Sequence, residues 1–185
     1  MDDGAGSYRR FLKGDDSGFT EIVKQYRDGL LFFINGYVGN LPIAEELTED
    51  VFFTLAVRKP RYRDGGAFKT WLFTIARNKA LNYRKRQSRH RTVPLEEAEV
   101  DSGETDAFEK TVLQKEQSRQ LRRAMEKLAP DYREVLHLIY FENMSNDSAA
   151  RVLKKKKRQI ENLSYRAKKA LRRILEQEDF DYEEL

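Results

Sequence analysis

Apolar residues recur at helical spacing along most of this chain, and no stretch alternates convincingly with a period of two. Residues 19–38, 44–55 and 68–83 each carry apolar side chains three and four positions apart, and the Gly- and Pro-containing segments 39–42 and 59–60 interrupt them. Stripes of this spacing predict amphipathic helices that bury one face. We therefore expect an all-α fold without a sheet.

An acidic segment separates two helical parts of the chain. Residues 92–110, TVPLEEAEVDSGETDAFEK, lack a strong apolar stripe and contain Pro94 and Gly103, which is typical of a flexible linker. Helical spacing resumes near Gln114. We expect two small helical domains, at residues 1–91 and 114–176. A linker at residues 92–113 joins them, and a tail at residues 177–185 follows the second domain.

Composition argues against several classes of protein. The chain has no cysteine, so it has no disulfide framework, thiolate metal site or thiol nucleophile. It has no Gly-rich phosphate loop, and its two histidines, His90 and His137, lie far apart. We expect no catalytic residue, no metal and no cofactor. The N-terminus lacks an apolar signal-peptide core and the longest apolar run, Leu30 to Ile34, is too short to cross a bilayer, which favours a cytoplasmic protein.

The net charge of +4 is unevenly distributed over the 185 residues. Residues 61–91 contain ten basic residues and one acidic residue, and residues 121–175 contain 15 basic and six acidic residues. Residues 1–60, in contrast, contain seven basic and ten acidic residues. The two basic blocks predict contact with a polyanion such as nucleic acid, whereas the acidic first block indicates a different partner.

Four lysines, residues 154–157, divide two amphipathic segments near the C-terminus. Ser145 is a suitable N-cap for the first segment, and apolar spacing restarts at Ile160 in the second, longer and more basic one. A lone lysine run is usually a solvated basic turn. Between two such helices, however, it predicts the turn of a helix-turn-helix whose second helix, from Lys157, enters the major groove of DNA.

Both halves of the chain also resemble a known family. LAPDYREVLHLIYFENMS at 128–145, with residues 149–153 and 159–171, resembles the fourth conserved region of bacterial sigma factors. AEELTEDVF at 44–52 and FKTWLFTIARNKALNY at 68–83 resemble the second conserved region. Two such regions in this order, joined by a short linker, resemble the extracytoplasmic-function (group IV) sigma factors.

The resemblance implies a function and a set of partners. Residues 1–91 would be a sigma region 2 domain that binds core RNA polymerase and the −10 promoter element. Residues 114–176 would be a region 4 helix-turn-helix domain that binds the −35 element. The expected partners are core polymerase, promoter DNA and an anti-sigma factor, with the protein a monomer when free or in a 1:1 complex with the anti-sigma factor. The acidic linker would run through the RNA exit path of polymerase, and the acidic tail would screen the basic helix.

The resemblance also assigns residues to these tasks. An acidic, semi-exposed helix would contact polymerase through Glu45, Glu46, Leu47, Glu49 and Asp50. At the −10 element, Tyr62 and Asn78 would form the pocket of a flipped base, since Asn offers both a carbonyl and an NH₂ group. On composition alone Asn78 would be an ordinary exposed residue. Trp71 lies on the apolar stripe, so we expect it to pack in the core rather than stack on DNA. The other −10 contacts would be Arg63, Lys69, Arg77, Lys79, Arg84, Lys85 and Arg86.

At the −35 element, the second helix and its turn would read the major groove. Asn162 and Arg166 lie one turn apart and reach base edges, whereas Lys155, Lys156 and Arg158 lie beside phosphates. Glu161 stands where the family commonly has Arg and would accept a hydrogen bond from cytosine. The full predicted −35 set is Lys155, Lys156, Lys157, Arg158, Glu161, Asn162, Tyr165, Arg166 and Lys169. The alternative is a stand-alone helix-turn-helix regulator, which would bind DNA without polymerase.

Overall fold

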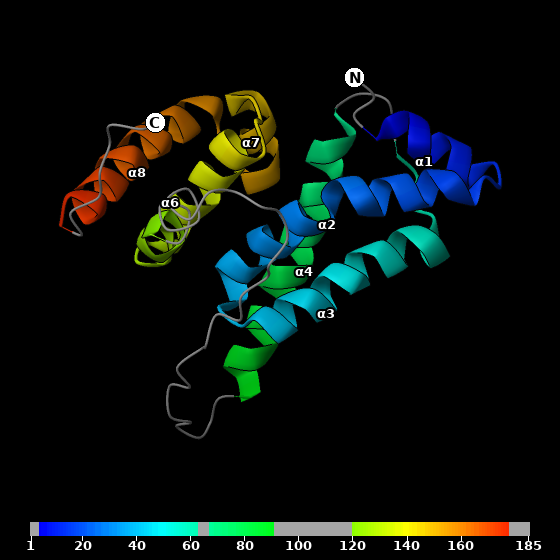
Figure 1. The fold of residues 1–185 in the computed structure, drawn as a ribbon, viewed down its shortest axis with the longest axis horizontal. Helices are drawn as coiled ribbons and strands as arrows, with labels where there is room; N and C mark the ends of the chain where they lie inside the picture. Colours follow the sequence, from blue (N-terminus) through cyan, green and yellow to red (C-terminus); the bar gives the residue numbers. More distant parts are fainter. Residues whose placement is uncertain (1–3, 63–66, 91–119, 178–185) are drawn as a thin grey trace.

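The computed structural model of the protein describes residues 4–62, 67–90 and 120–177. Every regular element among these residues is helical and no strand occurs in these ranges, which agrees with the predicted all-α fold. Figure 1 shows the elements in chain order. The linker predicted at 92–113 and most of the predicted acidic tail lie outside the described residues.

The N-terminal domain contains α1 (Ala5–Leu12), α2 (Asp16–Val38), α3 (Leu41–Phe53), a π-helical extension η1 (Thr54–Arg58) and α4 (Phe68–His90). Side-chain caps begin two of them, because Asp15 accepts a hydrogen bond from the backbone N–H of Ser17 and Asn40 accepts one from that of Ile43. Gly39 ends α2 in the left-handed conformation, with φ 62°. We had not predicted α1.

The C-terminal domain begins with a helical segment at residues 120–126. It continues with α6 (Pro130–Leu136), a π-helical turn η2 (His137–Phe141), α7 (Asn146–Leu153) and α8 (Lys157–Gln177). Pro130 occupies the first turn of α6, where its missing N–H costs no intrahelical hydrogen bond. This confirms the predicted start of that helix.

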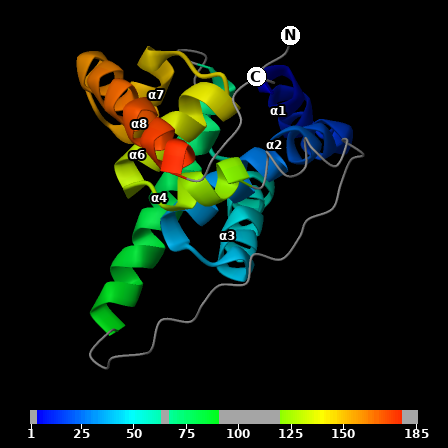
Figure 2. The same ribbon diagram turned by 60° about the vertical axis from the view of Figure 1, so that its left-hand side comes forward.

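The two domains share a continuous apolar core rather than lying apart. Helices α6 and η2 pack against α2, and α7 packs against α4. Figures 1 and 2 both show the C-terminal helices lying against the α2–α4 side of the N-terminal domain. Val135 and Leu138 of the C-terminal domain are fully buried, as is Phe73 of α4. Helix α6 packs against both α2 and α8, which explains why the consecutive residues 134–138 are all buried.

Candidate nucleic-acid interface

The helix pair around the lysines has the predicted geometry. Ser145 caps α7, with its side chain accepting a hydrogen bond from the backbone N–H of Ser148 at 3.2 Å. Lys154 ends α7 with φ 53°, and α8 begins at Lys157 after the two intervening residues Lys155 and Lys156. Gln159 accepts a hydrogen bond from the backbone N–H of Lys156 at 2.7 Å, which satisfies a donor at the start of α8. The four lysines therefore form the tight turn of a helix-turn-helix.

Helix α8 separates buried residues from exposed ones as the sequence predicted. Ile160 and Ala167 are fully buried, and Ser164 is also buried. The exposed residues include all the predicted −35 residues of this helix, namely Lys157, Arg158, Glu161, Asn162, Tyr165, Arg166 and Lys169. One face of α8 is therefore free to enter a groove of DNA.

Salt bridges connect the lysine turn to the preceding helices. Lys155 Nζ lies 3.3 Å from an Asp131 carboxylate oxygen at the start of α6, and Lys157 Nζ lies 3.0 Å from one of Asp147 on α7. The hydrogen bond to Asp147 raises the pKa of Lys157. Lys156 is exposed, whereas Lys155 is half-buried. The turn therefore has internal charge partners as well as solvent-facing cations.

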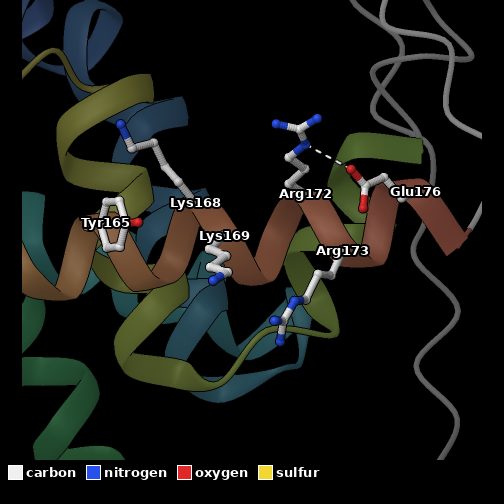
Figure 3. Close-up of a pocket in the computed structure, with 6 residues that line it drawn as sticks. All are labelled: Tyr165, Lys168, Lys169, Arg172, Arg173 and Glu176. Carbon is white, nitrogen blue, oxygen red and sulfur yellow. Dashed lines mark hydrogen bonds and ion pairs between the residues drawn. The ribbon is translucent and has the colours of Figure 1, made fainter.

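The basic face of α8 extends beyond the residues that the sequence analysis named. Figure 3 shows a pocket along the C-terminal half of this helix, lined by Tyr165, Lys168, Lys169, Arg172, Arg173 and Glu176. Lys169 and Arg173 project to one side, one turn apart, and Arg172 projects to the other side. Arg172 Nε donates to a Glu176 carboxylate oxygen at 2.8 Å. The stripe of Asn162, Arg166 and Lys169 thus continues to Arg173, four residues after Lys169. Helical spacing in the sequence could have identified Arg173 as part of this stripe.

The predicted −10 residues follow α4 and the chain before it. Arg84, Lys85 and Arg86 are exposed, and Arg77, Asn78 and Lys79 are half-buried. Tyr62 is half-buried, with its ring centroid 5.5 Å from that of Phe68 and 5.4 Å from that of Trp71. Trp71 also lies 5.4 Å from Tyr8, which supports the predicted packing role. Arg63 lies outside the described residues.

Two of these predicted −10 residues, Lys69 and Arg77, are engaged at the domain contact. Lys69 Nζ lies 2.6 Å from a carboxylate oxygen of Glu142, which follows η2. Arg77 Nε donates to the Tyr37 hydroxyl at 3.1 Å. Tyr37 is hydrogen-bonded in turn to Glu134 of α6, whose pKa burial raises. This contact was not predicted, because its partners are far apart in the chain.

The predicted polymerase-binding helix corresponds to α3. Glu45, Glu46, Glu49 and Asp50 are exposed. The expected partial exposure of Leu47 was wrong: it is buried, with 8% of its surface exposed, because it lies on the apolar stripe facing the core. The acidic face therefore consists of carboxylates alone. It borders a pocket between α2 and α3, lined by Phe19, Val23, Arg27, Leu31, Glu45, Thr48, Glu49 and Phe52.

Two other kinds of site are not found in the described part of the chain. There, no group of three or more His, Cys, Asp or Glu side chains is arranged to hold a metal ion. None of the helices in these ranges combines the length and apolarity that a membrane span needs.

Two models from one protein family match the chain. Sigma-70 region 2 matches residues 22–90, which run from α2 through α4. Sigma-70 region 4 matches residues 118–171, which include the helix-turn-helix. Together the two matches cover more than half of the chain, in the order that the sequence analysis predicted.

Curated relatives are sigma factors from several bacteria. The ECF RNA polymerase sigma factor BldN of Streptomyces coelicolor is 31% identical over 168 residues, which cover 90% of this chain and 63% of that protein. The RNA polymerase sigma-H factor of Pseudomonas aeruginosa is 26% identical over 175 residues and 91% of its length. The ECF RNA polymerase sigma-E factor of Escherichia coli K12 is 26% identical over 88% of both chains.

Two solved structures share the fold. One is the sigma factor RpoE in complex with the anti-sigma factor NepR from Bartonella quintana, with a TM-score of 0.67 and 21% identity over 85% of this chain and 96% of that one. The other is CnrH in complex with the cytosolic domain of CnrY, with a TM-score of 0.63 and 19% identity over 94% of this chain and 95% of that one. Given both family matches and these relatives, this chain belongs to the extracytoplasmic-function group of the sigma-70 family.

Proposed function

We propose that this protein binds core RNA polymerase and directs it to promoters by recognising −10 and −35 elements. The observation that carries the proposal is the presence of both sigma-70 regions, in order, on helical domains with exposed basic faces. Its action is binding rather than catalysis, and its place of work is the cytoplasm, where polymerase is found.

For the −35 element, α8 supplies the recognition helix. Asn162 and Arg166 are exposed one turn apart, at the spacing needed to read neighbouring base pairs. Lys156, Arg158, Lys169 and Arg173 supply cations for the flanking phosphates. Glu161 is exposed on the same helix and favours a cytosine partner over a guanine.

For the −10 element, α4 supplies Asn78 and the exposed cations at its C-terminal end. Asn78 is half-buried, which suits a residue in a base pocket better than an ordinary solvated position. Tyr62 offers a half-buried aromatic ring in the same domain, packed against Phe68 and Trp71. The acidic face of α3 offers Glu45, Glu46, Glu49 and Asp50 to a basic surface of polymerase.

Control by an anti-sigma factor forms part of the proposal. RpoE and CnrH, which share this fold, were each solved in complex with a partner, NepR and the cytosolic domain of CnrY. We expect a 1:1 complex here as well, and a monomer when this partner is absent.

The test is run-off transcription with purified core polymerase, this protein and a pool of randomised promoters. Specific transcripts are expected, and their sequences give both promoter elements. Asn78→Ala should lose selectivity at one −10 position, with Ser88→Ala, on the exposed C-terminal end of α4, as the matched control. Duplex binding through α8 without polymerase binding or transcripts would instead establish the stand-alone regulator.

A further inference from the structure

The contact between the two domains is held by polar side chains aimed at backbone atoms across it. His137 Nε2 donates to the carbonyl oxygen of Gly29 at 3.2 Å, and Arg133 Nη1 donates to that of Gly36 at 3.2 Å. In the opposite direction, Lys69 Nζ donates to the carbonyl oxygen of Glu142 at 2.7 Å. Such bonds require particular positions of both backbones, so the contact has a defined geometry.

Glu142 lies at the centre of this contact. Only 11% of its side chain is exposed, and its carboxylate lies 2.6 Å from Lys69 Nζ and 3.4 Å from His137 Nε2. Burial by itself would raise the pKa of Glu142, but hydrogen bonds and charge from His137 and Lys69 hold that pKa below its ordinary value. The charged carboxylate is therefore stabilised where it lies.

Two glycines on α2 make room for the C-terminal domain. Gly29 and Gly36 are seven residues apart, which places them on one face of the helix. A Cβ atom at Gly29 would lie 2.3 Å from Glu142 Oε1, and one at Gly36 would lie 3.3 Å from Arg133 Cδ. Glycine inside a helix is less favourable than alanine. The sequence thus accepts weaker helix propensity at the two positions that face the other domain.

The same contact engages part of the proposed −10 surface. Lys69 donates to the carbonyl of Glu142 and forms a salt bridge with its carboxylate, and Arg77 is bound to Tyr37 beside Glu134. Helix α7 packs against α4, the helix that carries Asn78. A DNA phosphate that approached Lys69 would have to displace Glu142.

We propose that this contact is an intramolecular latch: the C-terminal domain closes over α2 and α4 through Glu142, and the free chain must open before Lys69 is available to DNA. Because the consequence for promoter DNA rests on the proposed function, the test has one arm that needs neither polymerase nor promoter. The latch itself requires only the two domains and the residues at their contact.

The first arm measures the separation of the domains in the full chain. The absence of cysteine allows two labels to be placed uniquely, through Lys24→Cys on α2 and Arg151→Cys on α7, both at exposed positions. The wild-type background should show high resonance energy transfer. Gly29→Ala should lower the transfer, although alanine favours α2 itself. Fluorescence of Trp71, the sole tryptophan, verifies that the N-terminal domain remains folded.

Matched variants make the result specific to the Glu142 contact. Gly36→Ala should lower the transfer less, because its Cβ would meet a flexible arginine side chain at 3.3 Å. Adding Gly29→Ala to Glu142→Ala should cause no further opening, because the clashing carboxylate is already absent. If both Gly29→Ala and Glu142→Ala keep the wild-type transfer while Trp71 reports a folded domain, the latch is refuted.

The second arm measures binding of a fluorescent, randomised single-stranded DNA pool to the chain without polymerase. Gly29→Ala is expected to bind it at least threefold more tightly than wild type, and Lys69→Ala in the same background should remove part of that gain. Opening without this gain would refute the masking of Lys69. If opening is observed but the protein never binds polymerase, the latch stands and the proposed function fails.

Discussion

The extended basic stripe on α8 leads to a quantitative prediction for the salt dependence of promoter binding. Lys169 and Arg173 are exposed and project to the same side of α8, one turn apart. If each one neutralises a DNA phosphate, each contributes about 0.9 to the slope of log Kobs against log salt concentration. Lys169→Ala with Arg173→Ala should then reduce that slope by about 1.8.

The same slope sets the expected loss of affinity. Between 50 and 200 mM salt, one phosphate contact changes affinity by about 3.5-fold, so the double variant should lose about 12-fold less affinity than wild type over this range. The assay is fluorescence anisotropy of a labelled promoter duplex with polymerase reconstituted from core enzyme and this protein. The polymerase contribution is common to both and cancels in the difference.

Arg172 provides the matched control for this experiment. It is one residue away from Arg173 but projects to the other side of α8, and its guanidinium is paired with Glu176. Arg172→Ala should therefore change the slope by clearly less than Arg173→Ala. Equal slopes for the double variant and wild type would refute the placement of this stripe on DNA.

The remaining predictions concern stability and the domain contact. Ile160→Ala, at a fully buried position of α8, should destabilise the C-terminal domain by about 2–5 kcal/mol in urea unfolding, and a cost below 1 kcal/mol would contradict its core role. Ser145→Ala removes the cap of α7 and should cost about 1 kcal/mol in the same assay, whereas Ser145→Asp should retain most of the stability. The pKa of Glu142 is held below its ordinary value of 4.5, so its charge stabilises the closed form at neutral pH and this contribution is lost as pH falls below 4.5. Burial raises the pKa of Glu134, which also lies at the contact, so acidification favours the closed form through Glu134. The difference in energy transfer between wild type and Glu142→Gln isolates Glu142, and it should shrink progressively as the pH is lowered below 4.5; a difference that did not shrink at all would contradict this assignment.

Local patterns sufficed to predict most of the helices and the exposed face of α8. The cap at Ser145, the start of α6 at Pro130 and the stripe that begins at Ile160 and includes Ala167 depend on neighbours within one or two turns. The separation of buried and exposed residues therefore follows from helical periodicity. Leu47 was the exception, because assignment by resemblance took precedence over its place on the apolar stripe.

Contacts between distant residues could not be predicted in this way. The partners Lys69 and Glu142 are 73 residues apart, and His137 and Gly29 are 108 residues apart. The clue that was present is the seven-residue spacing of Gly29 and Gly36 in a long helix, which is unfavourable unless another backbone or side chain approaches there. Helix α1 was missed because its eight residues are too few for a repeated stripe.

The salt bridge between α3 and α4 links the two proposed binding surfaces. Lys79 Nζ lies 3.5 Å from a carboxylate oxygen of Asp50, so a proposed −10 cation and a proposed polymerase-binding anion neutralise each other in the free chain. A partially exposed pair of this kind contributes about 0.2–1 kcal/mol. When polymerase binds Asp50, the salt bridge breaks and Lys79 can bind a phosphate. When DNA binds Lys79, Asp50 becomes available to polymerase. Through this pair each ligand would raise the affinity of the other by the same factor, about 1.4- to 5-fold, as thermodynamic reciprocity requires.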